Sequence, residues 1–153
     1  MTMSESLYIQ LINQRNMEYT LFHVYKLKAE NEKDPILRVI YQKLSDDSLG
    51  HMAFVEKALV MLRIKAGREI PKPIMMKVVS LDPSSMRKEE VAVDEVDVWL
   101  EEMETASAIY FGAFADEFPD KRLSTFFNRI RDNELEHQKL LKDIKEYRKM
   151  KSP

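Results

Sequence analysis

The chain has 153 residues, 44% of them hydrophobic and 33% charged, and a formal net charge of −2. It contains no cysteine, which excludes disulfides, zinc knuckles, iron–sulfur clusters, thiol catalysis and rubredoxin-type iron sites. The near balance of charge gives no electrostatic case for nucleic-acid binding. No segment is apolar over the length of a membrane span, and residues 1–13 lack a signal-peptide core. We therefore expect a cytoplasmic protein that binds neither nucleic acid nor membrane.

Apolar residues recur at helical spacing in four long segments. They predict helices over about 4–31, from 35 to about 65, over about 93–117, and from 121 to about 149. A linker that contains glycine and several prolines separates the second helix from the third, over 66–92. With only three glycines in the chain, this composition is typical of an all-helical protein.

Two short turns divide the helices into antiparallel hairpins. Asp34 and Pro35 have the pattern of a helix N-cap followed by proline at the first helical position, and Asp120 marks the second turn. The linker between the hairpins is long enough to cross a bundle. Two short turns separated by one long connection are typical of the ferritin-like bundle, so we predict one ferritin-like four-helix domain over the whole chain, with hairpins at about 4–65 and 93–149. Four apolar linker residues are expected to pack on the helices as a short fifth element: Met75, Met76, Val78 and Val79.

The two hairpins are related by an internal repeat. Residues 17–59 align without a gap on residues 103–145, at an offset of 86 residues. The repeat pairs two of the three histidines, His51 and His137, and places each of them 33 residues after a glutamate. Eight positions are identical in the two copies: Met17/Met103, Glu18/Glu104, Ala29/Ala115, Asp34/Asp120, Leu37/Leu123, Asp46/Asp132, Leu49/Leu135 and His51/His137.

The paired glutamates and histidines have the spacing of metal ligands. Glu18 lies 16 residues before Asp34 and His51 lies 17 after it, so both are expected about 25 Å from the turn, side by side on antiparallel helices. Glu104 and His137 stand in the same relation to Asp120. We expect the four residues to meet at one level of the bundle.

Two further carboxylates accompany this frame. Glu134 precedes His137 by three residues, so both project from one helix face, which is the Glu-x-x-His element of di-iron bundles. Glu101 stands one turn before Glu104. Several carboxylates are costly to bury without a cation, whereas carboxylates and imidazoles together suit iron, manganese or zinc. The remaining histidine, His23, has no partner in the repeat and is not expected to be a ligand.

The order of these glutamates and histidines along the chain resembles the rubrerythrin branch of the ferritin-like superfamily. The order is Glu18, His51, Glu101-x-x-Glu104 and Glu134-x-x-His137. The resemblance extends from about residue 8 to 147 but is weak outside the ligands. It implies a di-iron site in which a Glu-x-x-Glu serves both metals, redox chemistry with peroxide or dioxygen, and a tyrosine beside the site, here Tyr25 as the candidate catalytic residue. Without a rubredoxin module, the chain would need a separate electron donor. We also expect a homodimer.

One position departs from this family pattern. The family has Glu-x-x-His on the second helix as well, whereas this chain has Ser48 three residues before His51. A hydroxyl is a poor ligand, and the adjacent Asp47 lies about 100° around the helix. The repeat therefore predicts an asymmetric site with two iron ions, or one if nothing compensates for Ser48.

Three functions are compatible with these patterns. The first is a non-haem iron peroxidase or oxidoreductase with the site described above. The second is iron oxidation with storage or delivery by a larger assembly. The third is a metal-free interaction module in which the histidines are merely buried and the site is a relic.

Overall fold

The computed structural model describes residues 3–66, 69–76 and 93–151. The described residues form four helices and no strand: α1 (Met3–Asn31), α2 (Pro35–Ala66), α3 (Val93–Glu117) and α4 (Lys121–Lys151). The predicted all-helical class is confirmed, and the predicted helices end within two residues of the observed ones. No described helix has an apolar stretch long enough to cross a membrane.

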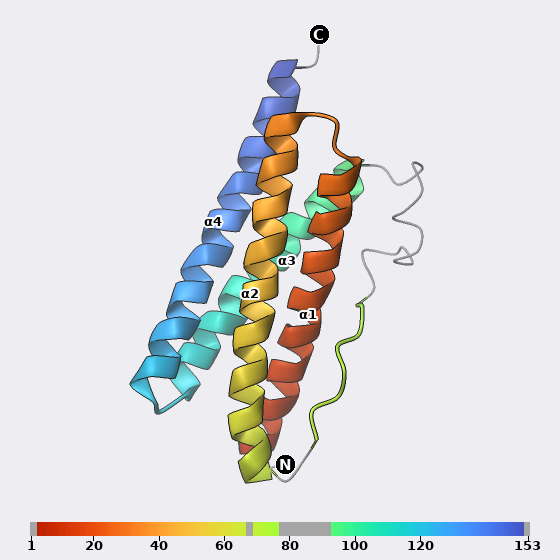
Figure 1. Ribbon diagram of the computed structural model, residues 1–153. Helices are drawn as coiled ribbons and strands as arrows, with labels where there is room; N and C mark the ends of the chain where they lie inside the picture. The colour runs from red at the N-terminus through yellow and green to blue at the C-terminus, as the bar shows by residue number, and fades with distance from the viewer. Residues whose placement is uncertain (1–2, 67–68, 77–92, 152–153) are drawn as a thin grey trace. The chain divides into compact units, whose positions relative to one another are not determined.

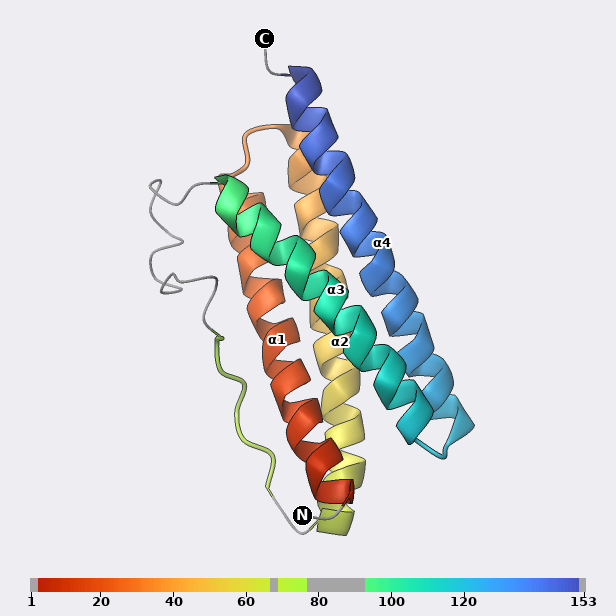
Figure 2. The same ribbon diagram turned by 180° about the vertical axis from the view of Figure 1, so that it is seen from behind.

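The helices pack as two hairpins, α1 with α2 and α3 with α4 (Figures 1 and 2). The chain divides into two compact units, Met1–Met76 and Lys77–Pro153, and each unit contains one hairpin. The prediction of two hairpins is confirmed. The ferritin-like arrangement of all four helices stays a prediction, and so does the path of the crossover beyond residue 76, since residues 77–92 lie outside the described part of the chain.

Each hairpin turns at an aspartate that caps the following helix. Asp34 Oδ1 accepts hydrogen bonds from the backbone amides of Ile36, at 2.9 Å, and of Leu37, at 3.4 Å. Asp120 Oδ1 is bonded in the same way to the two corresponding amides of α4, at 2.8 and 3.4 Å. These bonds satisfy amides that would otherwise lack partners in the first turn. The repeat is therefore a structural repeat as well as a sequence repeat at both turns.

Apolar side chains fill the interior of each unit in a different way. Near its turn the second hairpin has an aromatic cluster, in which Phe127 packs on Phe111, Phe114 and Phe118 with ring centroids 5.1–6.1 Å apart. The first hairpin has mainly aliphatic residues and tyrosines instead. Its fully buried side chains include Leu11, Leu21, Tyr25, Tyr41, Leu44 and Leu59.

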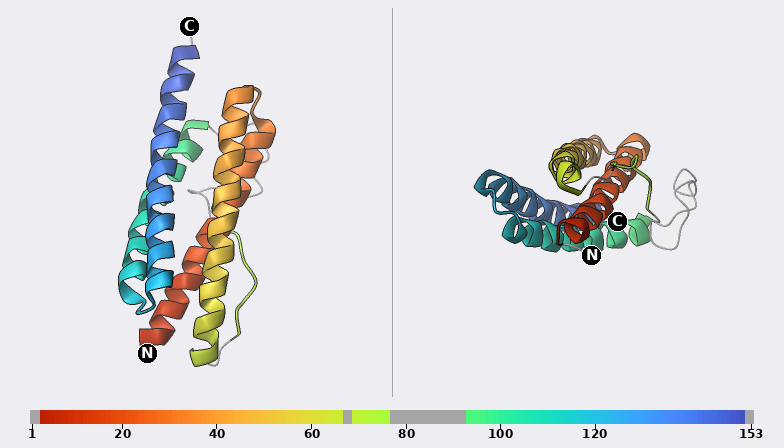
Figure 3. Two further views of the ribbon diagram at one scale, coloured as in Figure 1. Left: turned by 60° about the vertical axis from the view of Figure 1, so that its left-hand side comes forward. Right: turned by 90° about the horizontal axis from the view of Figure 1, so that it is seen from below.

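A segment without secondary structure, residues 69–76, lies along α1, and we call it the strap (Figures 1 and 2; Figure 3 gives two further views). Polar side chains of α1 hold it. The Tyr8 hydroxyl donates to the carbonyl of Glu69, while Thr20 Oγ1 accepts from the Met76 amide at 2.8 Å. Because the contacts advance along both segments in the same direction, the strap carries the chain back along α1 toward the Asp34 turn.

The strap accounts for part of the predicted fifth element. Met75 and Met76 are half-buried in it, although the strap is not a helix. Val78 and Val79, the other two residues of that prediction, lie outside the described residues.

Gly50, in the middle of α2, offers a test of the helix energetics. A Cβ added there meets no atom within 4 Å, so Gly50→Ala should gain helix propensity without a clash, about 0.5–1 kcal/mol. For a domain of this size we expect the thermal midpoint to rise by about 2–4 °C in circular dichroism.

Gly112 provides the matched comparison. Its added Cβ would lie 3.3 Å from Arg131 Cδ, so Gly112→Ala should gain less. A lower midpoint for Gly50→Ala than for the parent chain would contradict the packing described at this position.

Candidate metal centre

The second hairpin brings three of the predicted ligands together. Glu104 lies on α3, Glu134 and His137 lie on α4, and all three side chains have no solvent exposure. His137 Nδ1 lies 3.3 Å from Glu104 Oε1 and 3.8 Å from Glu134 Oε1. One ligand atom from each residue lies within 4.8 Å of the other two. We refer to these three residues as the α3–α4 cluster.

The helix register that makes this cluster follows from the sequence. Glu134 and His137 share a face of α4 because they are three residues apart. Glu104 lies at a similar distance from the Asp120 turn, 16 residues before it against 14 and 17 after it. A polar link next to the cluster fixes the same register. Gln138 Nε2 donates to Thr105 Oγ1 at 2.7 Å, and each of these residues directly follows a member of the cluster.

The α3–α4 cluster fits a divalent transition metal. Oxygen and nitrogen ligands lie about 2.0–2.2 Å from such an ion, which puts ligand atoms on one ion roughly 3–4.4 Å apart. The separations of 3.3 and 3.8 Å are in this range. Two carboxylates and one imidazole suit iron, manganese or zinc. A cation would also offset the cost of keeping two carboxylates away from water.

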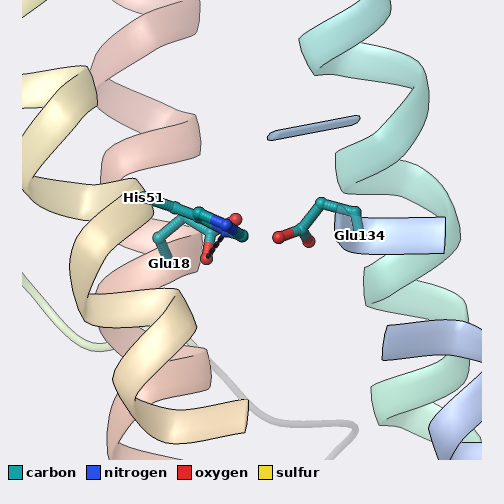
Figure 4. A group of neighbouring side chains, drawn as sticks. All are labelled: Glu18, His51 and Glu134. Carbon is teal, nitrogen blue, oxygen red and sulfur yellow. Dashed lines mark ion pairs between the residues drawn. The ribbon is translucent and has the colours of Figure 1, made fainter. Parts of the chain in front are cut away.

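The first hairpin brings the other predicted pair together. Glu18 on α1 is completely buried and His51 on α2 is 8% exposed, and His51 Nδ1 lies 3.6 Å from Glu18 Oε2. Figure 4 shows the two side chains pointing toward each other, and it also draws Glu134 of α4. A hydrogen bond sets the register of this hairpin too, since Ser45 Oγ donates to the carbonyl of Phe22 at 3.0 Å. Four of the predicted ligands thus form a matched Glu–His pair in each hairpin.

Glu101 has different surroundings. Its carboxylate is partly exposed and lies 3.8 Å from Lys145 Nζ. It is not a member of the α3–α4 cluster found among the described residues. Its role as a ligand stays a prediction, and in this structure the side chain pairs with a surface lysine.

Tyr25, the candidate catalytic residue, is completely buried on α1. It lies two turns after Glu18 on the same helix face. The repeat aligns it with Phe111, which is also completely buried, so only the first hairpin has a phenol at this position. His23 packs its ring against Tyr19, with centroids 4.5 Å apart, and is not in a metal-ligand group of the described chain.

An ion pair near Glu18, in which the arginine is buried and the glutamate is partly exposed, was missed in the sequence. Arg15, one turn before Glu18, is 1% exposed and its guanidinium lies 3.2 Å from Glu56 Oε1. The repeat carries the signal that could have revealed this pair. It aligns Arg15 with Glu101 and Glu56 with Lys142, so that the charge changes sign at both positions.

Stability measurements with and without metal test the α3–α4 cluster. In EDTA, Glu134→Gln should be at least as stable as the parent chain, because an amide costs less to bury than a carboxylate. With Mn²⁺ at about 100 times its dissociation constant, the parent should gain about 2.7 kcal/mol and the variant should lose most of that gain. Thermal unfolding at several Mn²⁺ concentrations measures both effects.

Glu136→Gln is the control, because Glu136 is exposed on the same helix. It should gain stability with Mn²⁺ as the parent does. An equal gain in Glu134→Gln would show that Mn²⁺ binds elsewhere.

Comparison with known protein families, with characterised proteins and with solved structures finds no match to this chain. Function must therefore be inferred from the ligands themselves. Two buried Glu–His pairs related by a repeat, one of them completed by a second carboxylate, are the features that any proposed function has to explain.

Proposed function

We propose that this chain is a rubrerythrin-like iron protein that reacts with peroxide or dioxygen. One observation carries the proposal. Glu104, Glu134 and His137 are completely buried, and one ligand atom of each lies within 4.8 Å of the others. Side chains that carry charge are rarely buried together unless they pair or coordinate a metal.

The donor set supports a metal and the ligand order favours iron. Carboxylate and imidazole ligands suit iron, manganese and zinc alike. The order of glutamates and histidines along the chain resembles the rubrerythrin pattern, in which the metal is iron. Iron bound there would supply electrons to an oxidant by changing between its ferrous and ferric states.

The chain's own residues would hold and shield this centre. Glu104, Glu134 and His137 would hold one ion, and their burial keeps bulk water away from it. Glu18 and His51 would supply ligands to a second ion. Tyr25, two turns along α1 from Glu18, is the proposed redox-active side chain.

The proposal also includes two partners. Electrons would come from a separate donor protein, because a chain without cysteine cannot form a rubredoxin-type site. The protein would act as a homodimer. Both follow from the resemblance of the ligand pattern.

Metal counting tests the proposal directly. Protein produced with added iron and purified without oxygen should contain about one to two iron ions per chain. The double variant Glu134→Ala with His137→Ala should lose at least half of them, while Glu136→Ala should keep them. Addition of peroxide to the anaerobically reduced protein should then produce ferric absorption within the mixing time.

Two results would contradict the proposal. Substoichiometric iron in the parent chain, together with equal melting of the double variant with and without iron, would leave a metal-free interaction module. A large hollow assembly in size-exclusion chromatography, loaded with many iron ions per chain, would indicate iron storage instead.

A further inference from the structure

Ser48 carries a buried hydroxyl that has no hydrogen-bond partner in the described part of the chain. The side chain has no solvent exposure. Ser45, one turn earlier on α2 and equally buried, donates instead to the Phe22 carbonyl at 3.0 Å. Buried polar atoms nearly always have a partner, so the hydroxyl of Ser48 has an unused capacity for hydrogen bonding.

The position of Ser48 connects it with the Glu18–His51 pair. It precedes His51 by three residues, so the two side chains share a face of α2, and His51 Nδ1 lies 3.6 Å from Glu18 Oε2. The repeat aligns Ser48 with Glu134, whose carboxylate lies 3.8 Å from His137. A short hydroxyl in the first hairpin thus replaces a carboxylate that faces a histidine in the second.

This replacement changes both space and charge. A glutamate side chain is longer than that of serine by a methylene and a carboxylate group. Among residues of the first hairpin, a divalent ion held by Glu18 and His51 would meet one carboxylate, whereas the α3–α4 cluster offers two. The nearby cation Arg15 is paired with Glu56 at 3.2 Å and leaves this balance unchanged. Within its own hairpin, the Glu18–His51 pair therefore has one carboxylate fewer than the α3–α4 cluster, and the buried Ser48 hydroxyl stands at the corresponding position.

We propose that Ser48 binds a small monocarboxylate, such as formate or acetate, that completes the coordination of an ion held by Glu18 and His51. The hydroxyl donates a hydrogen bond to one carboxylate oxygen, and the other oxygen takes the role that Glu134 has in the second hairpin. This inference rests on the proposed function, because it requires an ion in the first hairpin.

Cobalt substitution provides the readout, since the visible absorption of Co²⁺ depends on its ligands. The intact chain is loaded with Co²⁺ and titrated with formate, and perchlorate at the same ionic strength serves as the non-coordinating control. We expect formate, and not perchlorate, to change the spectrum saturably. Ser48→Ala should weaken formate binding by about tenfold, the loss of one hydrogen bond to a charged group.

Two more variants test the assignment by restoring and moving the carboxylate. Ser48→Glu should remove the formate response and bind the ion more tightly, because the protein then supplies the missing ligand. Glu134→Ser should add a second formate-dependent change. Circular dichroism checks the folding of each variant, and Ser48→Ala alone decides the result if Ser48→Glu does not fold.

The outcomes separate this inference from the proposed function. Co²⁺ binding with no effect of formate would overturn the inference and leave the proposed function standing. Equal formate affinity in the parent and Ser48→Ala would overturn the role of the hydroxyl. Failure of the parent chain to bind Co²⁺ or iron would overturn both.

Discussion

The need to neutralise buried carboxylates governs the arrangement of the second hairpin. Glu104 and Glu134 have no solvent exposure and face a single imidazole, His137, at 3.3 and 3.8 Å. Two features keep the carboxylates and the imidazole at one level of the hairpin. They are the Asp120 cap at the start of α4 and the hydrogen bond from Gln138 to Thr105. Such a cluster is expensive for stability alone, and a bound cation is the simplest way to offset the cost.

The repeated frame has different surroundings in its two copies. Both have an aspartate cap, which helps to fix helix register, and a Glu–His pair, which supplies the candidate ligands. Around the pair the two copies differ: in the first the buried Arg15 pairs with the partly exposed Glu56, whereas in the second the partly exposed Glu101 lies beside Lys145. The same hairpin frame therefore supports two environments with different charge around the same Glu–His pair.

Local patterns were sufficient to predict the helices and the meeting of the candidate ligands within each hairpin. Helix ends depend on capping and apolar periodicity, and Glu104, Glu134 and His137 could be located by counting from Asp120. The packing of Met75 and Met76 was expected, but the path of the strap could not be predicted. Its bonds join α1 side chains to backbone groups 56–61 residues away in a segment without periodicity. The pairing of Glu101 with Lys145 also escaped prediction, since long side chains choose between neighbours that sequence spacing does not rank.

The strap has a consequence for hydrogen exchange around Glu18. Asn16 Oδ1 accepts from the amide of Ile74 at 3.3 Å and Thr20 Oγ1 accepts from that of Met76, so the strap is attached to α1 on both sides of Glu18 along the chain. These amides belong to no helix, yet their exchange with solvent requires the strap to separate from α1. Their protection factors would thus report local opening next to Glu18, at two positions that are otherwise typical of an unprotected loop.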